Sequence, residues 1–133
     1  MSVISAKGIL IIANFISSQF SVIIHNKLLF IFLLGIAPLK DALINEKSDL
    51  VQASAAWTLG QIGGHSPDHA RAMAEADIPS TLLTVYKFKE SSEDLKKKCK
   101  KALKSILQMC SFLSALEPLI SESPDDILQY VLH

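Results

Sequence analysis

The chain has 133 residues, enough for one ordinary domain with one hydrophobic core. Its 13 basic and 13 acidic residues cancel, so net charge gives no reason to expect a general attraction to nucleic acid or to an anionic membrane. Cys99 and Cys110 have no second pair and no histidine at metal-ligand spacing, which argues against a disulfide framework or a zinc site and suits a reducing cytosolic compartment.

The N-terminal part of the chain is unusually apolar. Residues 9–36 are rich in Ile, Leu and Phe, and His25 and Lys27 are their only titratable groups. The stretch is long enough for a membrane span, but polar residues interrupt it, and its longest clean apolar run, Leu28–Leu34, is too short to cross a bilayer. A membrane helix is therefore disfavoured, and a buried helical pair is a second interpretation.

A first helical unit follows. An apolar pattern predicts a helix over 39–44, and Asp49 is placed to cap a second, longer helix. The glycines at 63–64 predict its end, and the Ser-Pro pair at 66–67 predicts a short third helix that reaches about Glu75. The longer helix has one apolar face, made by Val51, Ala55, Leu59 and Ile62.

The same series recurs later in the chain. Pro79 repeats Pro38 at a shift of 41, and a second long helix repeats the apolar face at a constant shift of 44, with Leu95, Cys99, Leu103 and Ile106. A helical period of about 40–47 residues is typical of armadillo and HEAT solenoids, in which each repeat packs on its neighbours. The predicted core of the two units comprises Leu39, Leu43, Val51, Ala55, Leu59, Ile62, Leu82, Leu83, Val85, Leu95, Cys99, Leu103 and Ile106.

Several segments resemble armadillo-repeat proteins. The run VQASAAWTLGQIG at 51–63 is similar to the third helix of an armadillo repeat. The segments HSPDHARA at 65–72, SSEDL at 91–95 and ALEP at 115–118 narrow the resemblance to armadillo-repeat proteins of the ciliary and flagellar central apparatus. The resemblance covers about 37–133. It implies an all-α, armadillo-type solenoid fragment without a cofactor, which acts as a protein-binding scaffold on the central-pair microtubules of cilia and sperm tails.

The resemblance also divides the chain into segments. Residues 1–8 are expected to end a preceding repeat, 37–108 to form two armadillo-type repeats, and 109–133 to form a partial C-terminal repeat. Residues 9–36 match nothing in the family. We favour the interpretation that they are a non-family insertion, because their residue bias is the one that AT-rich non-coding sequence gives on translation. The exposed apolar surface of such an insertion would promote aggregation.

Trp57 and Gln61 are one candidate for peptide binding. They lie one turn apart, and in armadillo importers a Trp and an Asn at this spacing hold extended peptides, so the resemblance implies that Gln61 can offer its amide to a peptide backbone. The corresponding pair in the next unit is Lys101 and Ser105, so no ladder of such pairs continues. Packing of Trp57 between helices is therefore favoured over a peptide contact.

A run of lysines is the second candidate for protein binding. The lysine stripe, opposite the apolar face of the second long helix, consists of Lys97, Lys100, Lys101 and Lys104. It is either a solvated face or an acceptor for an acidic partner such as the glutamate-rich tails of tubulin. Third helices line the concave surface of the armadillo fold, which favours the second interpretation. No aromatic or Arg residue interleaves with the lysines, so nucleic acid is disfavoured.

Chemistry-bearing motifs are weak in this sequence. His65 and His69 have a metal-ligand spacing, but they straddle a helix start and have no third ligand nearby. There is no catalytic Ser/His/Asp order, glycine-rich phosphate loop or evident carboxylate pair, so we expect no catalytic, metal or cofactor site. The expected partners are axonemal proteins, tubulin among them, and the expected location is the cytoskeleton of a cilium or flagellum. A soluble armadillo adaptor for cargo or signalling is the alternative.

Overall fold

The computed structural model describes residues 28–111 and 113–132, and the side chains of 36–111 and 114–132. Within these ranges the chain forms seven α-helices and no strand, which confirms the prediction of an all-α fold. The helices are α3 (Leu28–Asn45), α4 (Asp49–Gly63), α5 (Pro67–Glu75), α6 (Ile78–Lys87), α7 (Glu93–Met109), α8 (Leu113–Glu122) and α9 (Asp125–Val131).

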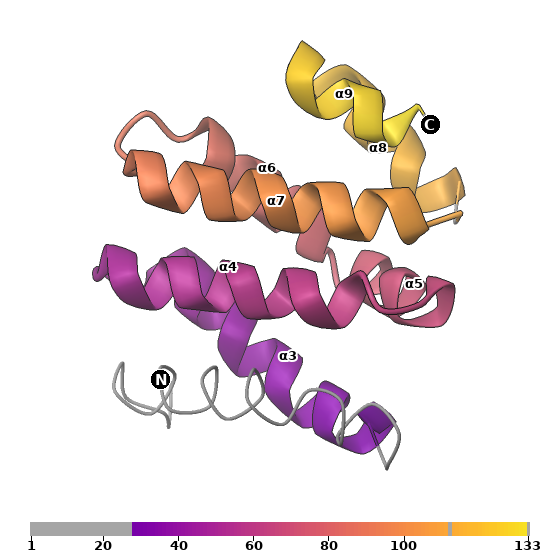
Figure 1. Ribbon diagram of the computed structural model, residues 1–133, viewed down its shortest axis with the longest axis horizontal. Helices are drawn as coiled ribbons and strands as arrows, with labels where there is room; N and C mark the ends of the chain where they lie inside the picture. The colour runs from indigo at the N-terminus through magenta and orange to yellow at the C-terminus, as the bar shows by residue number, and fades with distance from the viewer. Residues whose placement is uncertain (1–27, 112, 133) are drawn as a thin grey trace.

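The helices stack as two similar units. The long helices α4 and α7 run side by side in one layer, with α6 behind α7 (Figure 1). Within each unit a long helix packs on the helix before it, so α3 packs on α4 and α6 packs on α7. Between the units α4 packs on α7 and α3 packs on α6, while α9 extends the stack by packing on α7. This is the arrangement that the repeated sequence pattern predicts for a solenoid.

Serine side chains set the starts of the helices. The side chains of Ser48, Ser66 and Ser92 each accept a hydrogen bond from a backbone N–H in the first turn of α4, α5 and α7. Such caps satisfy N–H groups that have no partner within the helix. The prediction that Asp49 caps α4 is therefore wrong by one residue. Asp49 is the first helical residue, where its negative charge suits the positive end of the helix dipole.

The helix α3 crosses a predicted boundary in the sequence. It is continuous over Leu28–Asn45 with Pro38 inside it, so the junction at 36–37 falls within one helix. Ile36 is buried in the core. The segments 1–8 and 9–27 lie outside the described residues, so their assignment stays a prediction. In the described part of the chain, no helix has both the length and the apolar character needed to cross a membrane.

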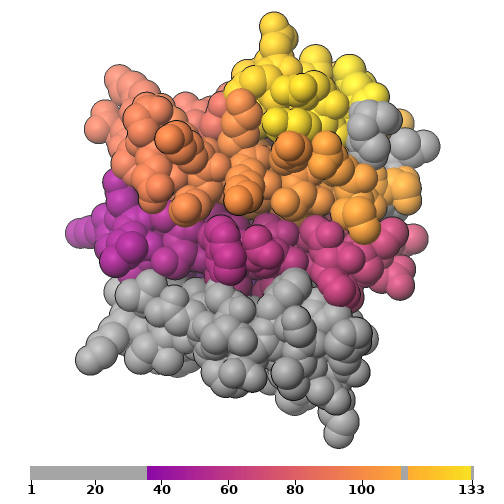
Figure 2. Space-filling model, in the orientation of Figure 1, coloured from indigo at the N-terminus to yellow at the C-terminus, as the bar shows by residue number. Residues whose placement is uncertain are grey.

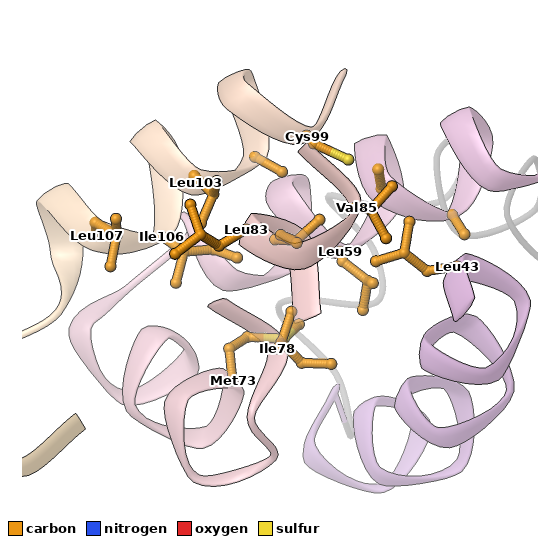
Figure 3. Packing of buried hydrophobic residues seen from close by; sticks show 14 of the residues in the cluster. Leu43, Leu59, Met73, Ile78, Leu83, Val85, Cys99, Leu103, Ile106 and Leu107 are labelled. Atoms are coloured by element: carbon orange, nitrogen blue, oxygen red, sulfur yellow. The ribbon is translucent and has the colours of Figure 1, made fainter. Parts of the chain in front are cut away.

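The core lies where the two units meet. In Figure 3, Leu43, Leu59 and Val85 come together from α3, α4 and α6, and Leu103 and Ile106 approach from α7. Every residue of the predicted core is buried. Removing these apolar side chains from water is the main source of stability for a chain of this kind. The core fixes the outward direction of the remaining side chains on α4 and α7, which form the candidate binding surface.

Candidate protein-binding surface

One face of the molecule is formed by α4 and α7, seen as adjacent bands in Figure 2. On α7 the buried residues occupy one side, and Lys97, Lys101 and Lys104 are exposed on the other. Their spacing of four and three residues places them in one row along the helix. We call Lys97, Lys101 and Lys104 the exposed lysine triplet. None of the ion pairs in the described ranges involves these three residues.

The fourth lysine of the predicted stripe is engaged inside the molecule. The Nζ atom of Lys100 lies 3.2 Å from Oδ2 of Asp126, at the start of α9. The hydroxyl of Tyr86 in α6 donates a hydrogen bond to the same carboxylate. Asp126 therefore joins α6, α7 and α9. Because Lys100 pairs with a residue of α9, it helps to hold α9 against α7 and is less available to a binding partner than the other lysines of the stripe.

The contacts of Asp126 shift the acidity of two groups. The hydrogen bond from Tyr86, and then the nearby ammonium of Lys100, lower the pKa of Asp126 against an opposing effect of burial. The same hydrogen bond, helped by burial, raises the pKa of Tyr86 to about 12. Both shifts favour the pairing of a neutral phenol with an ionised carboxylate. This pairing keeps Lys100 opposite a negative charge at neutral pH.

The Trp57 and Gln61 pair lies on the same side of the solenoid as Lys98 and Lys101 of α7. After Gln52, the residues of α4 and its C-cap that are not buried are Ser54, Trp57, Gln61 and Gly64. Their equivalents at a shift of 44 on α7 are Lys98, Lys101, Ser105 and Gln108, and these are not buried either. Because α4 and α7 pack as equivalent helices, the two rows lie on one face. Trp57 and Gln61 are each half-buried, so a peptide contact by this pair stays a prediction.

The remaining polar clusters do not add to this surface. The rings of His65 and His69 meet edge to face with their centres 5.2 Å apart, and burial lowers the pKa of His69. Among the described residues, no three His, Cys, Asp or Glu side chains come together as a possible metal site. Cys99 and Cys110 are buried free thiols, and burial raises the pKa of Cys99 to about 12.

Comparison with known proteins places this surface in context. No protein-family model matches the chain. Over 90 residues, which are 68% of the chain, it is 51% identical to sperm-associated antigen 6 of Homo sapiens and 50% identical to that of Mus musculus. The chain resembles a region of sperm-associated antigen 6. This confirms the resemblance indicated by its sequence segments and supports an armadillo-type assignment of the helical stack. The matched region is 18% of the length of each relative, so the chain spans about a fifth of sperm-associated antigen 6.

Proposed function

We propose that the chain is a non-enzymatic, protein-binding scaffold of the axonemal central apparatus that supports ciliary and sperm-flagellar structure and motility. The observation that carries the proposal is the 51% identity to sperm-associated antigen 6, whose name associates it with sperm. The stacked helices support it, because a solenoid presents an extended surface to partners. On this proposal the chain resides with the cytoskeleton of the cilium or flagellum.

The proposed contact with the axoneme is the exposed lysine triplet. A single exposed charge pair contributes only about 0.2–1 kcal/mol, so binding needs several lysines on one acidic partner. The glutamate-rich tails of tubulin have this chemistry, and such an interaction weakens as salt rises. Removal of those tails with a protease is therefore expected to reduce binding of the chain to microtubules. Equal binding to tailless microtubules would exclude this partner.

A soluble armadillo adaptor for cargo or signalling is the second candidate. The Trp57 and Gln61 pair favours it, since a half-buried Trp and an amide one turn apart can hold an extended peptide. The lack of an equivalent pair on α7, where Lys101 and Ser105 stand, weighs against a long peptide site.

Fractionation of ciliated cells separates these functions. A tagged chain that is an axonemal scaffold stays with the detergent-insoluble axoneme, an adaptor stays in the soluble fraction, and a membrane-tethered protein enters the detergent extract. Aggregated protein would also pellet, so the control is the same chain in cells of that line before they grow cilia, where it must be soluble. Recovery in the soluble fraction of ciliated cells would reject the scaffold function.

We also propose that residues 9–36 are a non-family insertion between 1–8 and the repeats at 37–108, with a partial repeat at 109–133. The residue bias of the apolar segment supports it. Sequencing the transcript across codons 8–36 tests it. A retained intron at this place is the expected result, and one uninterrupted exon would reject the proposal.

A further inference from the structure

A groove of about 630 Å³ lies at one edge of the stack. The connection between α3 and α4 forms one wall, and the end of α6 with the connection to α7 forms the other. Its apolar lining is made by Leu43, Ile44, Val85 and Phe88, and its charged lining by Glu46, Lys47, Asp49 and Glu90. The groove therefore joins equivalent corners of the two successive units. Its volume is within the range of about 300–1,000 Å³ that ligand sites occupy.

Two of the four apolar side chains in this groove are open to solvent, whereas Leu43 and Val85 are buried. Phe88 is 56% exposed and Ile44 is 53% exposed. The sequence places Ile44 in the apolar pattern of the first helix with Leu39 and Leu43, but its side chain lines the groove and is not part of the core. A large aromatic and a branched aliphatic side chain in one concave site provide the anchoring contact of many protein interfaces.

Three neutral polar side chains of the groove donate hydrogen bonds to backbone carbonyl groups of the protein. The Thr84 hydroxyl donates to the carbonyl oxygen of Ser80 at 3.0 Å. The Ser91 hydroxyl donates to that of Val85 at 2.8 Å, and the amide of Gln52 donates to that of Leu43 at 2.9 Å. These bonds use the two hydroxyl protons and one N–H of the Gln52 amide inside the protein. The groove therefore offers a partner mainly apolar surface and the charge of its rim.

The rim of the groove carries unneutralised negative charge. Glu46, Asp49 and Glu90 outnumber the single cation Lys47. Among the described residues, none of the ion pairs involves these three carboxylates. Opposite charges steer partners to such a site and select among them. This charge has the opposite sign to the exposed lysine triplet, so the two surfaces suit different partners.

We propose that this groove binds a short basic peptide segment of a partner protein, with a bulky apolar side chain between Ile44 and Phe88 and Lys or Arg side chains opposite Glu46, Asp49 and Glu90. The apolar anchor supplies affinity and the basic residues supply selectivity. The site is separate from the lysine surface of the proposed function. A change at Phe88 is therefore expected to leave axoneme binding through α7 unaltered.

Fluorescence anisotropy with the full chain tests the groove. The probe is a fluorescein-labelled hexapeptide of two central leucines with two lysines on each side. Phe88→Ser is expected to weaken binding of the probe at least about tenfold, and Glu90→Lys, which reverses one exposed charge, about three- to tenfold. The matched controls Leu132→Ser and Glu117→Lys change an exposed apolar and an exposed acidic residue outside the groove, and should leave the Kd within about twofold.

Four results would overturn the proposal. The first would be that the probe does not bind at millimolar concentration, and the second that a probe with serines in place of the leucines binds as tightly. The third would be that the control variants weaken binding as much as the groove variants, while circular dichroism shows that all four variants are folded. The fourth would be that Phe88→Ser lowers the mass of the free chain in sedimentation, which would mean that a second copy occupies the groove. Glu90 is an exposed connection residue, so Glu90→Lys keeps the test valid if Phe88→Ser misfolds.

Discussion

The Cα atom of Ala102 in α7 lies 2.7 Å from the position that a Cβ on Gly60 of α4 would occupy. The Cβ of Ala102 is equally close to that position. Real Cβ atoms do not approach other carbon atoms so closely, so the two helices can stack at this distance only because residue 60 has no side chain. The close approach of the two repeats therefore requires a glycine at position 60, and Gly63 and Gly64 come similarly close to Ile106 and Ser105 of α7.

Gly60→Ala is expected to destabilise the fold. Alanine is the better helix former by about 1 kcal/mol, but the added methyl group meets the backbone of α7, and overpacking costs about 1–3 kcal/mol. Urea unfolding followed by circular dichroism measures the difference. Ser54→Ala, on the half-buried side of the same helix, is the control and should change stability by less than about 0.5 kcal/mol. A Gly60→Ala chain more stable than the wild type would disprove the close stacking.

Leu59→Ala is expected to lower the free energy of unfolding by about 2–5 kcal/mol, because it leaves a cavity at a fully buried position between the units. The matched control is Leu50→Ala in the same helix, where the leucine is 65% exposed. That control should stay within about 0.5 kcal/mol of the wild type. Equal losses in the two variants would place Leu59 outside the core.

The contact of Tyr86 with Asp126 predicts a dependence of stability on pH. The pKa of Asp126 is lower in the folded chain than its ordinary value of 3.8, so its contribution is present above pH 3.8 and is lost as the pH falls through the folded value. The pKa of Tyr86 is raised from 10.0 to about 12, so its contribution is present below pH 10 and is lost as the pH rises through about 12.

Tyr86→Phe is expected to reduce the loss of stability at acid pH and the loss at alkaline pH. It should lower the free energy of unfolding at neutral pH by about 1 kcal/mol or less, since the side chain of Asp126 is 39% exposed. Unfolding at acid, neutral and alkaline pH gives the comparison. In a chain that already carries Asp126→Ala, which removes the acceptor of the Tyr86 hydroxyl, Tyr86→Phe should add little. Fully additive losses would show that the two residues do not interact.

The helices and the core could be predicted from the sequence because both depend on local spacing. Residues four apart on one helix face the same side, so Val51, Ala55 and Leu59 identify a buried face without any knowledge of the partner helix. The N-terminal caps of the helices could be predicted almost as well. The error at Asp49 arose because Ser48 and Asp49 are adjacent residues with similar capping ability.

The contacts between distant segments could not be predicted in this way. The pairing of Lys100 with Asp126 depends on how α9 packs on α7, and the sequence presents Lys100 only as one lysine of a run. The close approach at Gly60 could not be predicted either, because several small residues of α4 could have formed the contact with α7. The groove depends on Ile44 and Phe88, which the helix ends turn outward although their residue types favour burial.

Co-sedimentation with salt-washed axonemes tests the central claim of an axonemal scaffold that binds through α7. The informative variant carries Lys101→Glu and Lys104→Glu, and leaves Lys100 intact to keep its contact with Asp126. The charge-matched control carries Arg71→Glu and Lys89→Glu, at exposed positions outside α7 and outside the lining of the groove. Glutamate is also a good helix former, so helix content should persist in the α7 variant.

We expect the wild type and the Arg71/Lys89 control to pellet with the axonemes and to be released by salt, whereas the Lys101/Lys104 variant should stay in the supernatant. Equal pelleting of all three chains, or no pelleting of the wild type, would contradict this expectation.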